Sequence, residues 1–154
     1  MIDVKIFNNY KSMDASVKPN PEYATAGSSG MDLRADILEP IKIPPMARVI
    51  VSTGIHIELP TNTEAQIRPR SGLAAKQGIT VLNAPGTVDE DYTGEIKVIL
   101  INLSTEEVTI NPNDRIAQMI FAKVEKAKFE NVESLDQLHS TERGAGGFGN
   151  TGNR

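Results

Sequence analysis

Three adjacent carboxylates precede a tyrosine in the segment "GTVDEDYTGEIKV", which contains Asp89, Glu90, Asp91 and Tyr92. Neighbouring carboxylates raise one another's pKa, and a carboxylate that acts as a general base becomes more basic in this way. The segment also lies between two β-like stretches, where an acidic hairpin turn without chemistry would have the same composition. The residues alone therefore predict either a general base or a solvent-facing turn.

Two other stretches contain residues that could bind an anion. In "RPRSGLAAKQG", the Arg70 guanidinium, the Ser71 hydroxyl and the free N–H groups of a helix start would form an anion nest, although an ordinary capped turn is equally compatible. In "NDRIAQMIF", Arg115 and Gln118 project polar groups from an otherwise apolar strand. Taken singly, that stretch predicts only a strand with a salt-bridging arginine.

A fourth stretch, "AGSSGMDLRAD", alternates apolar and charged residues. If its apolar residues face the core, Asp32, Arg34 and Asp36 face the other way, and a solvated strand face is the simplest interpretation. The two histidines, His56 and His139, stand apart without metal-ligand spacing. We interpret them as ordinary surface or strand residues.

The C-terminal stretch "RGAGGFGNTG" contains the pattern G-x-G-x-x-G, which is usually interpreted as a dinucleotide-binding loop. Such a loop needs a helix after its glycines, and only five residues follow Gly149. Composition favours a glycine-rich tail. However, Arg143 could grip a phosphate and Phe148 could stack on a base, which indicates an arm that closes over a nucleotide.

Composition limits the class of protein. The chain has 154 residues, 39% of them hydrophobic, which is enough for one domain with a core. Its net charge of -4 argues against a general nucleic-acid binder, and the absence of cysteine suits a reducing compartment. The start lacks the features of a signal peptide, and no stretch approaches a membrane span. We expect a soluble cytoplasmic protein.

Period-two patterns and β-branched runs dominate the chain and predict an all-β, jelly-roll-like sandwich of many short strands. Ser71 would cap a single helical turn that ends at Gly78, and residues 132–138 would form a surface turn. Periodicity is lost from residue 140 onward, so we expect a domain over 1–139 and a flexible arm over 140–154. The predicted strands are "VKIF", "MDLRAD", "ARVIVSTGIHIEL", "EAQIRPR", "ITVL", "EIKVILIN", "EVTI" and "RIAQMIFAKV".

Taken in chain order, the five stretches with candidate chemistry resemble the five motifs of the homotrimeric dUTPases, and the likeness runs from about residue 26 to residue 152. The most specific motifs are "RSGLA", "GxxDxDYxG" and "RGxGGFGxTG". The resemblance implies hydrolysis of dUTP to dUMP and pyrophosphate by attack of water at the α-phosphorus. That reaction keeps uracil out of DNA and supplies dUMP for thymidylate synthesis. A homotrimer with sites shared between subunits is also implied.

The resemblance assigns roles residue by residue. Asp89 matches the carboxylate that orients and deprotonates the attacking water, and Tyr92 matches the ring under the deoxyribose that leaves no room for a 2′-hydroxyl. Asn83 and the backbone of Lys97 match the groups that pair with uracil. Asp32 matches a carboxylate that contacts magnesium through water. The substrate-binding set that follows is Arg70, Ser71, Gly72, Asn83, Gly86, Thr87, Val88, Tyr92, Lys97, Gln118, Arg143, Phe148, Gly149 and Thr151.

Within this set, Arg70, Ser71 and Gln118 match phosphate ligands. In the arm, Arg143 and Phe148 match phosphate and base-stacking contacts, and Thr151 matches a γ-phosphate ligand. Asn150 stands where the family often has serine or histidine, and we leave it out of the site.

Two alternatives remain beside this hypothesis. A dCTP deaminase has the same fold, although the "DEDYTG" and "GGFG" stretches argue against it. A non-catalytic trimeric regulator that binds nucleotides would differ in lacking turnover. A zinc-dependent deaminase is not compatible with a chain that lacks cysteine.

Overall fold

The computed structural model describes residues 1–12 and 20–146, so Phe148, Gly149 and Thr151 of the predicted site lie outside the described residues. Ten strands and one short helix make up the described chain. The strands are β1 (Lys5–Asn8), β2 (Met31–Arg34), β3 (Ile41–Ile43), β4 (Arg48–Glu58), β5 (Thr63–Arg68), β6 (Ile79–Val81), β7 (Gly86–Val88), β8 (Ile96–Asn102), β9 (Val108–Ile110) and β10 (Arg115–Lys123). The helix α1 spans Ser71–Gln77.

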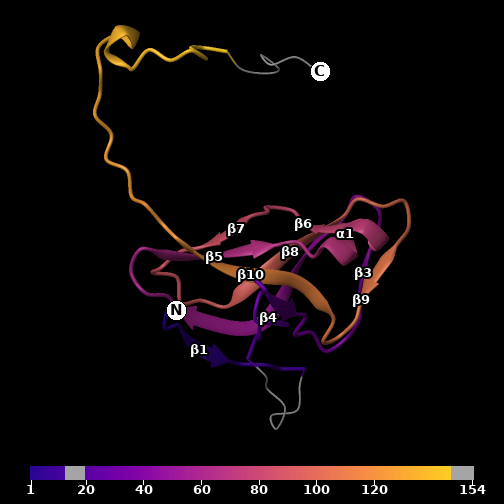
Figure 1. The fold of residues 1–154 in the computed structure, drawn as a ribbon. Helices are drawn as coiled ribbons and strands as arrows, with labels where there is room; N and C mark the ends of the chain where they lie inside the picture. The colour runs from indigo at the N-terminus through magenta and orange to yellow at the C-terminus, as the bar shows by residue number, and fades with distance from the viewer. Residues whose placement is uncertain (13–19, 147–154) are drawn as a thin grey trace.

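Two four-stranded antiparallel sheets form the body (Figure 1), one in the order β1-β4-β8-β6 and the other in the order β2-β10-β5-β7. The small pair β3-β9 lies at one end. Alternate side chains of the long strands point inward and form one apolar core. In β8, for example, Ile96, Val98 and Leu100 are buried. The predicted all-β sandwich is confirmed.

Two strands were not predicted. Both β3 and β7 have three residues and directly follow a proline, Pro40 or Pro85, which is a turn signal. The helix also differs from the prediction, because Arg70 occupies the N-cap position and Ser71 is the first helical residue of a seven-residue helix. The predicted end is confirmed, since Gly78 adopts the left-handed conformation there with φ of 66°.

Asp36 is buried, contrary to the expectation of a solvated strand face. β2 ends at Arg34, and the backbone of Asp36 donates to the Ser52 carbonyl at 2.8 Å. This turns the carboxylate inward, where it is 4% exposed and accepts hydrogen bonds from the backbone N–H groups of Lys11 and Ser12. The carboxylate therefore ties the N-terminal segment to β4.

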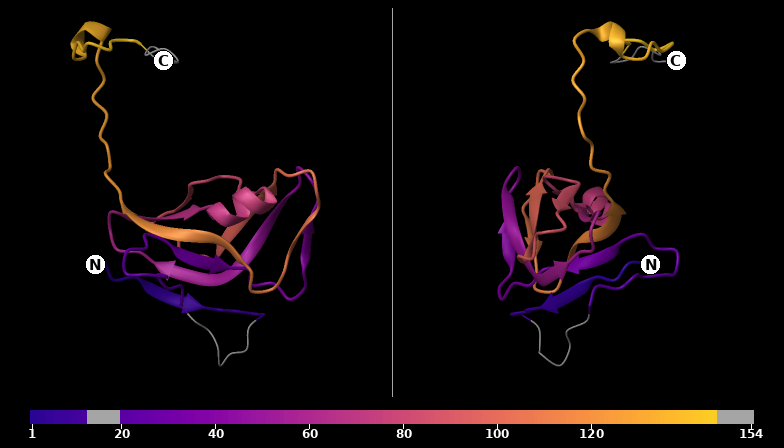
Figure 2. Two further views of the ribbon diagram at one scale, coloured as in Figure 1. Left: turned by 45° about the vertical axis from the view of Figure 1, so that its right-hand side comes forward. Right: turned by 90° about the vertical axis from the view of Figure 1, so that its left-hand side faces the viewer.

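The chain leaves the body after β10, as both views of Figure 2 show. From Glu125 to Ala145 every residue is exposed, including Phe129 at 88% and Leu135 at 82%. A single 3₁₀ turn, Leu135–Gln137, falls in the predicted surface turn. The domain boundary between residues 139 and 140 stays a prediction. In the described part of the chain, no helix is long and apolar enough to span a membrane.

Asn102 provides a test of how the small sheet is attached. Its side chain is 0% exposed, donates to the carbonyls of Ile43 and Glu106, and accepts from the N–H and hydroxyl of Ser104. Asn102→Ala removes these four hydrogen bonds, whereas the Ser104 hydroxyl and the Glu106 carbonyl keep a bond to each other. We therefore expect it to lower the free energy of unfolding by about 3 kcal/mol.

Urea unfolding at one protein concentration measures this loss. Asn111→Ala is the matched control, since the Asn111 side chain is exposed and lies 3.4 Å from Asp114. Equal losses in the two variants would contradict the attachment role of Asn102.

Candidate functional site

A hollow of about 320 Å³ lies where β7, β8 and the turn between them meet. It brings together most of the predicted base- and sugar-binding residues. Apolar side chains from β4, β5 and β8 also line it. The lining residues are Ile50, Ile67, Val81, Asn83, Gly86, Thr87, Val88, Asp89, Tyr92, Glu95, Ile96, Lys97, Val98 and Ile99. Arg70, Ser71, Gly72 and Gln118 are not among them.

Asp89 follows β7 directly and begins the turn at the rim of the hollow. The Tyr92 N–H donates to the Asp89 carbonyl at 3.1 Å, which closes the turn. The Asp89 side chain belongs to an exposed residue, so water reaches it. A carboxylate in this position can accept a proton from a bound water, which is the chemistry that the sequence predicted.

Glu90 does not follow the prediction that the three adjacent carboxylates raise one another's pKa. Its side chain turns away from Asp89 and accepts hydrogen bonds from Lys126 Nζ at 2.7 Å and from the Asn62 backbone N–H. The hydrogen bond from Lys126 makes the largest contribution to lowering the pKa of Glu90 below its ordinary value, and the bond from the Asn62 N–H makes the next largest. The expectation that neighbouring carboxylates raise the pKa is therefore wrong for Glu90.

Tyr92 forms one wall of the hollow. The side chain is 45% exposed, and its hydroxyl donates to the Glu95 carbonyl at 2.9 Å. A Cβ atom on Gly94 would lie 2.6 Å from the ring, so only glycine at that position lets the ring fold back against the turn. The flat face of the ring is thereby fixed relative to β8.

The backbone of Lys97 faces the hollow because β8 is longer than its neighbour β6. The Leu82 N–H donates to the Ile99 carbonyl at 2.8 Å, so the N–H and C=O of Ile99 point toward β6. In an antiparallel strand every second residue points the same way, and Lys97 therefore presents its N–H and C=O on that side. Since β6 ends at Val81, these groups face the hollow beside Asn83.

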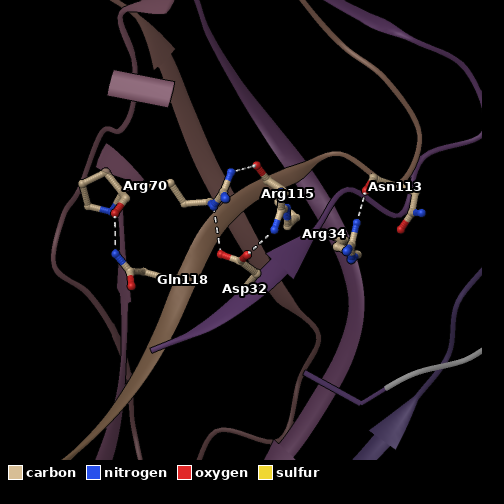
Figure 3. A network of polar contacts seen from close by, with 7 residues as sticks. Asp32, Arg34, Arg70, Asn113, Arg115 and Gln118 are labelled. Atoms are coloured by element: carbon tan, nitrogen blue, oxygen red, sulfur yellow. Dashed lines mark hydrogen bonds and ion pairs between the residues drawn. The ribbon is translucent and has the colours of Figure 1, made fainter. Parts of the chain in front are cut away.

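A second group of polar residues, here called the arginine cluster, consists of Asp32, Arg70, Arg115 and Gln118 (Figure 3). Asp32 of β2 accepts from Arg70 Nε at 2.8 Å and pairs with Arg115 at 3.4 Å. Gln118 donates to the Pro69 carbonyl at 2.9 Å and so fixes the segment before α1. The cluster lines up Arg70 and Gln118, two predicted phosphate ligands, next to the first turn of α1 with Ser71 and Gly72.

The arginine cluster and Asp89 lie at opposite ends of β5. Val88 pairs with Ala65, so Asp89 lies beyond that pair in one direction, whereas Arg70 follows the other end of β5. At ~3.3 Å per residue, the stretch from Glu64 to Arg70 corresponds to ~20 Å. Within one chain, the structure does not bring these two groups together.

Arg143 also lies apart from the hollow. It belongs to the C-terminal segment that leaves the body, and its Nε donates to the Gly146 carbonyl at 2.8 Å. Within one chain Arg143 is therefore not among the residues that line the hollow, and its contact with a phosphate stays a prediction.

A family model, described as dUTPase, matches residues 17–152. The chain belongs to the dUTPase family. It is 60% identical over 132 residues to deoxyuridine 5'-triphosphate nucleotidohydrolase of Neorickettsia sennetsu, a match that covers 86% of this chain and 87% of the relative. Identity to the protein of the same description from Cytophaga hutchinsonii is 57% over 143 residues, which cover 92% and 90% of the two chains.

Solved structures of dUTPases share the fold. A variant dUTPase of Staphylococcus bacteriophage 80alpha with dUpNHpp superposes with a TM-score of 0.78 at 18% identity, over 97% of this chain and 98% of that one. A variant dUTPase of phage phi11 of S. aureus, described for its coordination of a structural Mg(II) ion, gives 0.74 at 15% identity, over 88% and 99%. At these identities the likeness concerns the fold alone.

The dUTPase match decides against the deaminase alternatives. The family model runs through the hairpin with Asp89 and Tyr92, which is the segment that argued against a dCTP deaminase. The chain has no cysteine for a zinc site. Of the two histidines, His56 lies on β4 with Nδ1 3.1 Å from the Thr93 carbonyl, which agrees with its interpretation as a strand residue.

The described residues of this dUTPase are compatible with a magnesium ion that the substrate carries. Across residues 1–12 and 20–146, no three His, Asp or Glu side chains gather closely enough to hold a metal ion. Both Asp32 oxygens contact arginines. Mg²⁺ is commonly held by one or two carboxylates together with water and substrate phosphates, and such a donor set is compatible with Asp32 acting through water.

Sequence reasoning missed Glu95 as a residue of the hollow and did not include Arg115 in the predicted site. Arg115 was noticed as a polar group on an apolar strand, but its partner Asp32 lies 83 residues away in the sequence. Glu95 had no local signal, because its role depends on a contact with β4.

The Glu90–Lys126 pair can be checked by titration. In the folded state Glu90 has a lowered pKa, so its contribution to stability is present above the unfolded pKa and is lost as pH falls through the folded pKa. We expect NMR titration to show the Glu90 carboxyl titrating below its ordinary value of 4.5, and Lys126→Met to raise that pKa.

Part of the lowering should remain in Lys126→Met, because the Asn62 N–H is unchanged. Lys123→Met, at the end of β10, serves as the control for loss of a nearby positive charge. A Glu90 pKa that does not respond to Lys126→Met would contradict the pairing.

Proposed function

We propose that the hollow holds the deoxyuridine part of dUTP while the enzyme hydrolyses it to dUMP and pyrophosphate. One observation carries this proposal: a backbone donor and acceptor at Lys97, an aromatic wall at Tyr92 and an accessible carboxylate at Asp89 surround one cavity. A base, a sugar and an α-phosphate need these three groups in this order. The domain boundary at 139/140 and the cytoplasmic location remain predictions.

Uracil would be recognised by β8 as if it were a further strand. The N–H and C=O of Lys97 have a fixed polarity that matches the uracil edge and mismatches cytosine, whose donor and acceptor are reversed. Asn83 would add a side-chain amide, and Gly86, Thr87 and Val88 of β7 also line the hollow. The narrow space between β7 and β8 would exclude the thymine methyl group.

Deoxyribose would pack on the Tyr92 ring. A ribose 2′-hydroxyl would meet that ring and find no hydrogen-bond partner, and an unpaired hydroxyl discriminates strongly between substrates. Since the ring is held by its own hydroxyl bond to the Glu95 carbonyl, it cannot easily move aside.

Asp89 would act as the general base. It takes one proton from a water whose oxygen attacks the α-phosphorus, the bond from the α-phosphorus to the bridging oxygen breaks, and pyrophosphate leaves with that electron pair. Magnesium, when bound to the triphosphate, would draw negative charge from the leaving pyrophosphate. Asp32 would hold one of its water ligands.

The phosphate ligands would come from a neighbouring subunit. Asp89 must lie within hydrogen-bond reach of the attacking water, and Arg70 must contact the same triphosphate, yet ~20 Å of β5 separates them in one chain. The site is therefore completed when the arginine cluster of one subunit faces the hollow of another. Arg70, Ser71, Gly72 and Gln118 would then bind phosphate.

An apolar patch on the outer face of the β1-β4-β8-β6 sheet supports assembly into a homotrimer. Ile50 is 62% exposed beside Ile99, and Leu82 is 46% exposed next to them. Exposed apolar side chains gathered on one sheet face indicate a protein interface. Ile50 and Ile99 also line the hollow, so the interface and the site are continuous.

The C-terminal segment would carry the arm to a neighbouring site. Phe129 and Leu135 remain exposed in the single chain, which is unfavourable for apolar side chains and favours their burial against another subunit. Arg143 would then reach the triphosphate, with the predicted residues Phe148, Gly149 and Thr151 following it.

Replacing the proposed general base, Asp89, tests the proton-transfer step. We expect Asp89→Asn to bind dUTP with nearly unchanged affinity and to lose at least ~100-fold in kcat, because an amide cannot accept the proton from water. Calorimetry and steady-state release of pyrophosphate measure the two quantities. Asp91→Asn removes the same charge two residues away and should retain most of its kcat; equal losses would remove Asp89 from the role of base.

Mixed trimers test the sharing of sites. Asp89→Asn chains keep the arm, and chains that lack residues 143–154 keep Asp89, so neither should turn over dUTP alone. If Asp89 and the arm come from different subunits, every mixed trimer has one working site. Random equimolar reassembly makes about three-quarters of the trimers mixed, so roughly one quarter of the wild-type activity should return.

Native mass spectrometry confirms that mixed trimers have formed. Zero activity in a preparation with confirmed mixed trimers would mean that Asp89 and the arm act within one subunit.

A further inference from the structure

A bulge in β4 faces the turn that carries Tyr92. The register between β4 and β8 shifts between Ser52 and Ile55, so Thr53 and Gly54 form an irregular step opposite Ile96. At this step the Thr53 hydroxyl donates to the Ile96 carbonyl at 2.6 Å in the buried interior. Such a bulge redirects backbone groups that a regular strand would use for pairing.

Glu95 accepts a hydrogen bond from one of these redirected backbone groups, the Gly54 N–H. Its Oε1 accepts from the Gly54 N–H at 3.1 Å, and its Oε2 lies 3.7 Å from Lys97 Nζ. The Glu95 side chain is only 19% exposed, so water competes weakly for the bond. The backbone carbonyl of the same residue accepts from the Tyr92 hydroxyl.

The Gly54 position is itself fixed. Its φ is 67°, and a Cβ atom there would lie 2.7 Å from the Tyr10 ring and 2.9 Å from the buried Asp36 carboxylate. The Asn9 N–H donates to the Gly54 carbonyl at 2.7 Å. The packed N-terminal segment therefore fixes the position of the Gly54 N–H that donates to Glu95.

We propose that Glu95 is a positioning residue for sugar selection. Its side chain anchors the turn to the β4 bulge, and its carbonyl anchors the Tyr92 hydroxyl. The distance between the aromatic ring and β8 therefore depends on β4, although β4 contributes no polar group to the hollow. Glu95 touches neither the base nor the phosphates in this role. The proposal rests on Tyr92 being the residue that excludes a 2′-hydroxyl.

The measured quantity is the selectivity, defined as kcat/KM for dUTP divided by kcat/KM for UTP. Glu95→Ala removes the bond to Gly54, and we expect the selectivity to fall about five- to tenfold, the effect of one lost hydrogen bond on the ring position. Glu95→Gln keeps an oxygen that can accept from Gly54 and should stay within about twofold of wild type.

Glu58→Ala is the matched control, because Glu58 is an exposed β4 residue that pairs with Lys5. Tyr92→Phe removes the other end of the same tether while keeping the ring, and should also lower the selectivity. Because both bonds hold one ring, the double variant Glu95→Ala with Tyr92→Phe should lose less than the product of the two single effects.

Tyr92→Ala separates the two proposals. If it lowers the selectivity while Glu95→Ala and Tyr92→Phe leave it unchanged, Tyr92 selects the sugar and the positioning role of Glu95 is overturned. If Tyr92→Ala leaves it unchanged, the sugar assignment itself fails. Should Glu95→Ala not fold, Tyr92→Phe decides alone: wild-type selectivity in that variant overturns the tether.

Discussion

The unequal length of two paired strands is the constraint on which the site depends. β8 continues for several residues beyond the end of β6, while Ile96 and Val98 remain anchored in the core. A strand edge without a partner must satisfy its N–H and C=O groups elsewhere, since unpaired backbone groups are costly. In the proposed function this requirement would be met at Lys97 by uracil, whose complementary donor and acceptor would complete the edge.

The sheet pairings also leave the predicted site residues in two separate groups within the single chain. β5 pairs with β7 on one side and β10 on the other, and these pairings place Asp89 and Arg70 at opposite ends of the strand. No side-chain rotation can span that separation, because a strand is an extended and rigid element. In the proposed function the general base and the phosphate ligands would therefore meet across a subunit interface, and assembly would form part of the active site.

The sequence predicted the elements whose signal is local. Alternation predicted β8 and β10, and Gly78 predicted the end of α1. The three-residue β7 was not predicted, because it directly follows Pro85, which is a turn signal. Asp36 was wrongly expected to face solvent, because its burial depends on the segment around Lys11, a contact 25 residues away in the sequence.

For the site, the residue types indicated Asp89 and Tyr92, whereas most other roles came from family resemblance. The backbone of Lys97 illustrates why: its recognition groups are present in every residue, and only the end of β6 exposes them. Glu95 had neither a motif nor a local partner, since the N–H that it receives lies 41 residues away. Residues that position others are defined by tertiary contacts, which a single sequence does not reveal.

Charge distribution explains how an acidic chain can bind a triphosphate. The net charge is -4, yet the arginine cluster concentrates Arg70 and Arg115 around a single carboxylate, Asp32. Without substrate, that carboxylate keeps the two guanidinium groups oriented and offsets one of their charges. A triphosphate brings more negative charge than Asp32 can supply, and the guanidinium groups can contact it without leaving the carboxylate, since each has several donors. The guanidinium groups proposed to bind phosphate are therefore already held in place in the single chain, and less conformational entropy would be lost on binding.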